Sequence, residues 1–255
     1  MPVIMGVINM SPESFYSSSI CRSVEEAVEK AKSFVECGAD VVDVGGMSTA
    51  PYKNTWISEE EEIRRTVPVI KELCKLGFEV SVDTTRAVVA EKAVEAGAEI
   101  VNTVSPNEEI AEVVRKYGVR AVVAAKEVKW EESVRSILES TVLALKNDLK
   151  LFRGCKTIAD PAIGFWRKYG RWYMRDLAVL ANLDVIRKRV GRPVLIGVSR
   201  KSFIGEVAGV KDPEDRLPGS IAAEVFSMPD YVRTHSVKES YQAFKIVELL
   251  HTFRL

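Results

Sequence analysis

Polar side chains that could do chemistry stand where short apolar runs of this sequence end. Asp83 closes the run EVSVD, Asn102 closes EIVN and Asp160 closes TIAD. A single Asn or Asp at such a position is best interpreted as a helix cap. Because the pattern recurs along the chain, we interpret the whole set as a site. Its members are Asn9, Asp43, Thr49, Asp83, Asn102, Lys126, Asp160, Ser199, Arg200, Lys201, Arg233 and His235.

One group of these residues combines two carboxylates, a carboxamide and an ammonium group. It consists of Asp83, Asn102, Asp160 and Lys201. Such a set can accept hydrogen bonds from amino and imino groups and can donate to a carbonyl oxygen. It therefore favours the edge of a flat heterocycle as the ligand.

A second group carries positive charge. Arg233 and His235 occupy alternate positions of the run YVRTH, so in a strand both side chains face the same way. Two donors of this kind suit a phosphate or a diphosphate. Asn9 would add an oxygen ligand to a magnesium ion held by that diphosphate.

Eight short β-branched runs alternate with longer segments of helical period, which is typical of βα units around a parallel sheet. The 255 residues contain no Pro/Gly/Ser linker. The alternation therefore predicts one α/β domain over residues 1–255, a single (β/α)8 TIM barrel. In such a barrel the catalytic groups lie at the carboxyl ends of the strands. An open doubly wound sheet is the alternative, but its Gly-rich dinucleotide fingerprint is missing. The expected strands are Val3–Asn9, Asp40–Gly45, Glu79–Asp83, Glu99–Thr103, Arg120–Ala125, Thr157–Asp160, Pro193–Ser199 and Tyr231–His235.

Helix boundaries are also indicated. Ser23 and Ser58 are each followed three residues later by a glutamate, which is typical of a capping box. Glycine after a presumed helix end accepts the left-handed conformation that stops a helix; Gly38, Gly77, Gly97 and Gly118 stand at such positions. The expected helices include Ser23–Cys37, Ser58–Lys75, Ala87–Ala96 and Glu131–Lys150.

Composition excludes several classes of protein. The 36 basic and 36 acidic residues balance, which argues against nucleic acid or a membrane surface as the partner. No apolar run approaches the roughly 20 residues of a membrane span, and the N-terminal MPVIMGVINM lacks the basic region of a signal peptide, so we expect a cytoplasmic protein. The chain has two histidines, and its four cysteines form no C-x-x-C pair, so a zinc site is not expected.

Six segments resemble, in order, the motifs of the dihydropteroate synthase family. SRKSFIG and the VDT strand end are the most specific of them. The segments are MGVINMSPESF, DVGGMSTAP, VSVDTTRAVVAEKAVEAGAEIVN, ADPAIGF, VLIGVSRKSFIG and VRTHSVKES, and they cover the chain from residue 5 to about residue 240. The chain resembles a divergent, archaeal-like member of this pterin-binding barrel family.

The resemblance implies a transferase that condenses 6-hydroxymethyl-7,8-dihydropterin diphosphate with an arylamine, normally p-aminobenzoate, and releases diphosphate. It also implies a homodimer. The residues that would bind the pterin ring are Asp83, Asn102, Asp160 and Lys201. Those that would bind the diphosphate and its Mg²⁺ are Asn9, Arg233 and His235. Asp83, Lys201, Arg233 and His235 would be catalytic. Thr49 would lie beside the arylamine, Arg200 near the outer part of the pocket, and Gly197 would line the substrate site.

Departures from the family pattern fall mainly on the transfer side of the site. The family's GGESTRP is GGMSTAP here, so Met47 replaces an acidic residue and Ala50 replaces the arginine expected to meet the diphosphate. Ala162 and Trp166 stand where two glycines are expected, and Ser236 replaces an aspartate.

These departures leave three alternatives open. The first is a methyl-tetrahydropterin-dependent methyltransferase domain, which would not need the Arg233–His235 pair. The second is a synthase for a larger acceptor, such as the ribosylated aminobenzene phosphate of methanopterin-type cofactors, whose phosphate Lys126 would meet at the mouth. The third is a non-catalytic pterin-binding barrel.

Overall fold

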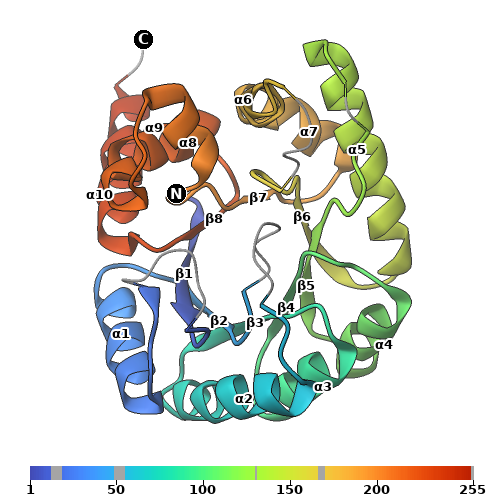
Figure 1. Ribbon diagram of the computed structural model, residues 1–255, viewed down its shortest axis with the longest axis vertical. Helices are drawn as coiled ribbons and strands as arrows, with labels where there is room; N and C mark the ends of the chain where they lie inside the picture. The colour runs from blue at the N-terminus through green and yellow to red at the C-terminus, as the bar shows by residue number, and fades with distance from the viewer. Residues whose placement is uncertain (13–18, 49–54, 130, 166–169, 254–255) are drawn as a thin grey trace.

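Eight parallel strands form the inner wall of the molecule, and helices surround them (Figure 1). The computed structural model describes residues 1–12, 19–48, 55–129, 131–165 and 170–253. Hydrogen-bonded neighbours follow the order β6-β5-β4-β3-β2-β1-β8-β7. A bridge between Ala159 and Val194 joins the two outer strands of this order. The sheet thus closes on itself, which confirms the predicted single (β/α)8 barrel.

Most strand boundaries agree with the sequence to within one residue, but the seventh strand does not. It was expected over Pro193–Ser199 and spans Leu195–Ile196. Pro193 has no N–H group for the ladder, and the ladder with β8 pairs Leu195 with Tyr231 and Ile196 with Val232. The strands are β1 (Val3–Asn9), β2 (Val41–Gly45), β3 (Glu79–Asp83), β4 (Ile100–Thr103), β5 (Arg120–Ala124), β6 (Lys156–Asp160), β7 (Leu195–Ile196) and β8 (Tyr231–Thr234).

The predicted helix starts are confirmed by their caps. The hydroxyls of Ser23 and Ser58 each accept a hydrogen bond from the backbone N–H three residues on, at 3.2 Å. The helix expected from Glu131 begins later because Ser133 caps it. The helices are α1 (Val24–Glu36), α2 (Glu59–Lys75), α3 (Ala87–Glu95), α4 (Glu108–Tyr117), α5 (Val134–Leu151), α6 (Tyr173–Ala181), α7 (Leu183–Val190), α8 (Ser202–Ala208), α9 (Leu217–Ser227) and α10 (Val237–Thr252), with a 3-10 helix, η2, over Pro213–Arg216.

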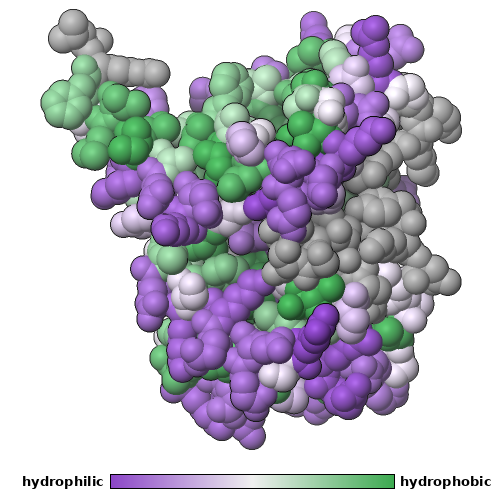
Figure 2. Space-filling model, turned by 60° about the vertical axis from the view of Figure 1, so that its left-hand side comes forward, coloured by the Kyte–Doolittle hydropathy of each residue, from purple (hydrophilic) through white to green (hydrophobic). Residues whose placement is uncertain are grey.

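One stripe of large apolar side chains on α10 faces solvent. Ile246, Leu249, Leu250 and Phe253 are exposed, and their spacing places them on one face of the helix end. Phe226 of the neighbouring α9 is exposed as well. Figure 2 shows hydrophobic residues gathered at the upper end of the molecule. Within the described residues, no helix combines the length and the hydropathy needed to cross a bilayer.

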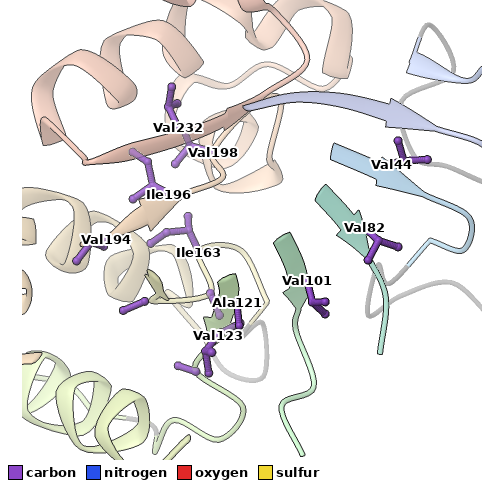
Figure 3. Packing of buried hydrophobic residues seen from close by; sticks show 14 of the residues in the cluster. Val44, Val82, Val101, Ala121, Val123, Ile163, Val194, Ile196, Val198 and Val232 are labelled. Carbon is purple, nitrogen blue, oxygen red and sulfur yellow. The ribbon is translucent and has the colours of Figure 1, made fainter. Parts of the chain in front are cut away.

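Two apolar clusters lie on opposite faces of the sheet. Met5, Val41, Ile100, Val122, Ile158 and Leu195 fill the inside of the barrel. The alternate strand residues pack outward against the helices, and Figure 3 shows Val44, Val82 and Val101 among them on neighbouring strands. Since side chains alternate along a strand, Asp43, Asp83 and Asn102 point inward, above the apolar filling. The fold therefore aims the strand-end polar residues into one space.

Glu224 of α9 is a buried carboxyl away from that space. Its Oε2 accepts a hydrogen bond from Ser240 Oγ of α10 at 2.6 Å, while its Oε1 has no hydrogen-bond partner among the described residues. Burial raises the pKa of Glu224 to about 7, against the opposing effect of the Ser240 and Thr234 hydroxyls. The folded protein binds this proton more tightly than the unfolded chain does. The protonated Glu224 therefore contributes its full share to the free energy of unfolding below pH 4.5, and this contribution is lost as the pH rises through about 7.

Glu224→Gln is therefore expected to stabilise the protein at high pH. At pH 8 the variant should exceed the wild type by about 2–3 kcal/mol in the free energy of unfolding, and at pH 5 the two should be similar. Urea unfolding at several pH values measures this, with Glu112→Gln, an exposed residue of α4, as the control. An unchanged pH slope in Glu224→Gln would show that Glu224 is ionised in the folded protein without cost.

Candidate active site

Arg233 of β8 is the centre of the polar cluster inside the barrel. Its Nε donates to Asp43 Oδ2 at 2.6 Å and its Nη2 donates to Asp83 Oδ2 at 2.7 Å. Burial alone would lower the pKa of Arg233, but Asp43 and Asp83 outweigh it and raise that pKa. Arg233 is thus a fixed cation that joins β8 to β2 and β3.

Asn102 of β4 belongs to the same cluster. Its Nδ2 lies 3.3 and 3.5 Å from the two carboxylate oxygens of Asp43. The sheet register places Asn102 beside Asp83 and Asp83 beside Gly45. Gly45 follows Asp43 by two residues on β2, so both lie on the same face of the sheet. The sequence marked Asp43 as a strand-end residue but assigned it no ligand. Its alternation with Gly45 was the available signal that it faces the interior.

Asp83 has one carboxylate oxygen left for a ligand. Its Oδ1 is buried and has no hydrogen-bond partner among the described residues. Burial raises the pKa of Asp83 to about 7; Arg233 opposes the rise, while Asp43, Glu62 and Asp160 add to it. A buried acceptor without a donor is costly, so this oxygen is suited to a donor that a ligand brings.

Asp160 and Lys201 form the other side of the space. Asp160 Oδ1 accepts from the Ala162 N–H at 2.8 Å, and burial raises the pKa of Asp160 although Lys201 opposes the rise. Lys201 Nζ donates to the Ile163 carbonyl and lies 4.5 Å from the centroid of the Phe165 ring. A Cβ at Gly164 would lie 2.8 Å from Lys201 Cδ, so this glycine makes room for the lysine.

A buried ion pair on α6 supports the loop that follows Asp160. Arg175 donates to the carbonyls of Pro161 at 2.6 Å and Ala162 at 3.3 Å. Asp176 accepts from the Gly164 N–H at 3.0 Å and pairs with Arg175 at 3.2 Å. These contacts hold Ala162 at φ 56°, a left-handed conformation in which a Cβ is strained.

Ala162→Gly is expected to raise the free energy of unfolding by about 0.5–1 kcal/mol, because relief of the Cβ strain exceeds the added freedom of glycine in the unfolded chain. Chemical denaturation measures the change. Ala178→Gly, within α6, is the control and should lower the free energy of unfolding by about 1 kcal/mol. A loss of stability in both variants would show that Ala162 carries no strain.

His235 lies one residue beyond β8 and beside Ser199. Its Nδ1 is 3.1 Å from Ser199 Oγ. Burial, followed by the charges of four surrounding cations, lowers the pKa of His235 well below its usual value. The imidazole is therefore neutral at pH 7 in a strongly positive environment. The cations are Arg233, Lys30, Arg200 and Lys201.

Lys30 of α1 is a member of this group that the sequence did not indicate. It lies in the middle of a helix, where a charged residue is expected on the solvent-exposed face. In the structure its Nζ lies 5.9 Å from the centroid of the Phe34 ring, and burial lowers the pKa of Lys30. The charge therefore adds to the positive potential around His235.

Two of the predicted cationic residues have partners within the protein. Arg233 pairs with Asp43 and with Asp83 of the expected ring site, and the binding of a phosphate by Arg233 and His235 stays a prediction. Arg200 donates to the carbonyls of Pro213 and Glu214 and to Ser236 Oγ. Its guanidinium therefore holds η2, and contact with a substrate stays a prediction.

Two further predicted residues, Asn9 and Gly197, lie at the ends of β1 and β7. Asn9 donates through Nδ2 to Ser19 Oγ at 2.6 Å, and a Cβ at Gly45 would lie 3.9 Å from Asn9 Oδ1. Gly197 lies against Arg233. Thr49 and Ala50 are outside the described residues. No group of three or more His, Cys, Asp or Glu side chains in the described part of the chain is arranged to hold a metal ion.

Lys126 was expected at the mouth, and the structure places it in a separate groove. Its backbone N–H donates to Asp148 Oδ2 of α5 at 2.8 Å. The groove has a volume of about 680 Å³ and is lined by Pro106, residues 126–129 and one side of α5. None of the residues around Arg233 lines this groove.

Known proteins match this chain along nearly its whole length. Residues 5–235 match the family described as pterin binding enzyme. A dihydropteroate synthase of Clostridium beijerinckii is 36% identical over 97% of this chain and 93% of its own length. A dihydropteroate synthase of Coxiella burnetii, solved with pteroic acid, has a TM-score of 0.86 at 30% identity, covering 99% of this chain and 94% of its own. A Xanthomonas albilineans dihydropteroate synthase, solved with 4-aminobenzoic acid, has a TM-score of 0.85 at 29% identity, covering 99% and 94%.

Proposed function

The chain belongs to the pterin-binding enzymes, and we propose that it condenses 6-hydroxymethyl-7,8-dihydropterin diphosphate with p-aminobenzoate and releases diphosphate. It is a transferase of the dihydropteroate synthase type. The observation that carries the proposal is the buried Asp83 Oδ1, which has no hydrogen-bond partner among the described residues and lies in a cluster with Arg233 and Asn102. An amino-substituted ring supplies the donor that this oxygen requires.

Asp83, Asn102, Asp160 and Lys201 are proposed to bind the pterin ring. The first three point inward from β3, β4 and β6, and Lys201 directly precedes α8. Two carboxylates accept the ring's N–H groups, and the lysine donates to its carbonyl oxygen. The Phe165 ring beside Lys201 would limit the access of water to that contact.

Arg233 and His235 are proposed to act on the leaving group. The bond between the pterin methylene carbon and the diphosphate oxygen breaks, and its electron pair departs on the diphosphate. The fixed charge of Arg233 stabilises that developing anion. His235, neutral because of burial and its cationic neighbours, offers a ring N–H to it. The arylamine nitrogen then forms the new C–N bond and releases one proton.

Mg²⁺ is proposed as the cofactor, held by Asn9 and the substrate diphosphate. Magnesium in enzymes commonly binds substrate phosphates and waters together with few protein oxygens. The carboxamide oxygen of Asn9 borders Gly45, as does Asp83 Oδ2, so the oxygen chemistry at this rim fits the ion. The metal would neutralise diphosphate charge, while Arg233 and His235 orient the anion.

We propose p-aminobenzoate as the acceptor because Lys126, the cation expected to meet a phosphorylated arylamine, lines the groove beside α5. The functional test is incubation with dihydropterin diphosphate, Mg²⁺ and a panel of arylamines, with diphosphate release as the readout. Release with p-aminobenzoate supports the proposal. Release only with a phosphorylated arylamine would identify the larger acceptor, and ring binding without release would indicate a non-catalytic barrel.

The apolar stripe of α10 is proposed to pair with a second copy of this chain. Ile246, Leu250 and Phe253 would be covered together with Phe226 of α9, as the core of a homodimer interface requires. The cytoplasmic location expected from the sequence stays a prediction.

Ile246→Glu combined with Leu250→Glu is expected to convert the dimer to a folded monomer, because two charges would be buried at the interface. Sedimentation velocity at micromolar concentration measures the mass. Leu143→Glu, at an exposed position of α5, is the matched control and should remain dimeric. A wild-type protein that sediments as a monomer would refute the homodimer.

A further inference from the structure

Glu62, in the first turn of α2, is a buried carboxylate that the proposed chemistry does not use. Its Oε1 accepts from Thr84 Oγ1 at 2.6 Å, and its Oε2 accepts from Arg86 Nη1 at 2.9 Å. The Arg86 and Glu62 side chains are 8% and 1% exposed. Burial raises the pKa of Glu62, and Thr84 and Arg86 oppose the rise. A buried ion pair adds little net stability, so a contribution to stability does not explain why this pair is buried here.

The two partners of Glu62, Thr84 and Arg86, lie one and three residues after Asp83 in the chain. The Thr84 N–H donates to the Asn102 carbonyl at 3.0 Å, and the Thr84 hydroxyl accepts from the Arg86 N–H at 3.2 Å. Thr84 is therefore held from β4 on one side and from α2 on the other. The backbone that carries Asp83 cannot shift without breaking one of these bonds.

Glu62 also fills the space behind the neighbouring strand end. A Cβ at Gly46 would lie 3.1 Å from the Glu62 carbonyl oxygen and 3.2 Å from Glu62 Cγ, so α2 packs directly on the end of β2. Arg86 Nη2 donates to the Ile57 carbonyl at 2.6 Å, and its guanidinium lies 4.7 Å from the Trp56 ring centroid. The pair thus fastens the start of α2 to the end of β3.

We propose that Glu62 and Arg86 are a positioning pair that fixes the carboxylate of Asp83 against the substrate ring without touching the ring themselves. Arg233 donates a hydrogen bond to the Asp83 carboxylate. Glu62 bonds to the adjacent residue, Thr84, and so restrains the backbone of Asp83. This inference rests on the proposed function, because the ring is the ligand assigned to Asp83.

The charge of Glu62 gives the pair a measurable signature. Four charged groups act on Asp83: Arg233 from β8, Asp43 from β2, Asp160 from β6 and Glu62 from α2. Besides burial, the three carboxylates raise the pKa of Asp83, and Arg233 lowers it. Removal of the Glu62 charge therefore lowers the pKa of Asp83, whereas removal of the Thr84 hydroxyl keeps the Glu62 carboxylate and its pairing with Arg86.

The test compares Glu62→Gln with Thr84→Val by calorimetric titration with a dihydropterin. At pH 8.5, where Asp83 is ionised in each protein, both variants should bind about tenfold more weakly than the wild type, the equivalent of one lost hydrogen bond to a charged group. In Glu62→Gln the midpoint of the pH dependence should also move to lower pH. In Thr84→Val it should stay near the wild-type value.

Two control variants separate positioning from stability. Glu60→Gln changes an exposed residue of the same helix turn and should bind like the wild type. Leu73→Ala, at a fully buried position of α2, should lower the Tm and leave both affinity and midpoint unchanged. Wild-type affinity in both Glu62→Gln and Thr84→Val would overturn the proposal.

Failure of the proposed function would be recognised by absence of dihydropterin binding in the wild type. The coupling between Glu62 and Asp83 is then tested in the ligand-free protein, because carbon-13 NMR follows the titration of the Asp83 carboxyl directly. A lower titration midpoint in Glu62→Gln supports the coupling of Glu62 to Asp83. An unchanged midpoint overturns it.

Discussion

Arg233→Ala is expected to lower kcat/KM about a thousandfold or more. The change removes the cation assigned to the departing diphosphate, and it also leaves Asp43 and Asp83 as buried carboxylates without their shared partner. An uncompensated buried charge costs about 3–5 kcal/mol. The variant should therefore lose affinity both for the dihydropterin diphosphate and for the corresponding alcohol.

His235→Ala separates the two roles of this region. His235 lies beside Ser199 and is assigned to the leaving group, so its loss should weaken binding of the diphosphate and spare the alcohol. Calorimetry with both ligands, alongside diphosphate-release kinetics, makes the comparison. Arg187→Ala, which removes an ion pair between α7 and Asp230, is the control. If Arg233→Ala kept its affinity for the alcohol, the link between the ring site and the diphosphate site would be refuted.

Asp83→Asn is expected to weaken dihydropterin binding by about 10- to 100-fold, because a charged acceptor in a buried site is replaced by an amide. In the wild type the ionised carboxylate is the acceptor, so the affinity should rise with pH through the Asp83 pKa of about 7 and level off above it. In Asp83→Asn this pH dependence should be lost. Fluorescence titration from pH 5.5 to 8.5 measures both effects.

Asp160→Asn and Asp184→Asn complete that experiment. Asp160 is the second carboxylate of the ring site, so its variant should lose affinity but keep the titration of Asp83. Asp184 is exposed on α7, and its variant should match the wild type. Unchanged affinity in both Asp83→Asn and Asp160→Asn would remove the basis for a pterin ring in this barrel.

The sequence predicted the barrel because its evidence is local. Apolar runs and helical segments alternate, and serine caps and glycine stops mark the helix ends. Both kinds of signal depend on a few adjacent residues. The seventh strand was predicted too long because the run Pro193–Ser199 continues past the two residues, Leu195 and Ile196, that pair with β8.

The candidate site was predicted in part for the same reason. Strand-end positions identified Asp83, Asn102 and Asp160, since alternation alone directs them inward. Their partners could not be predicted, because Arg233 and Asp43 are far apart in the chain and meet only when the barrel closes. Lys30 and Glu62 were missed because both belong to helices in which charged residues usually face water.

Arg233 with its two aspartates also limits how this site can change over evolutionary time. Replacing Arg233 alone leaves Asp43 and Asp83 as buried carboxylates without their shared cation, so that substitution is deleterious whatever its effect on chemistry. A neutral replacement of Arg233 becomes tolerable only when both aspartates are neutralised with it, because the effects of substitutions at contacting residues are strongly non-additive. Arg233, Asp43 and Asp83 are therefore expected to be inherited as one unit, while residues such as Ala50 and Ala162 can vary independently.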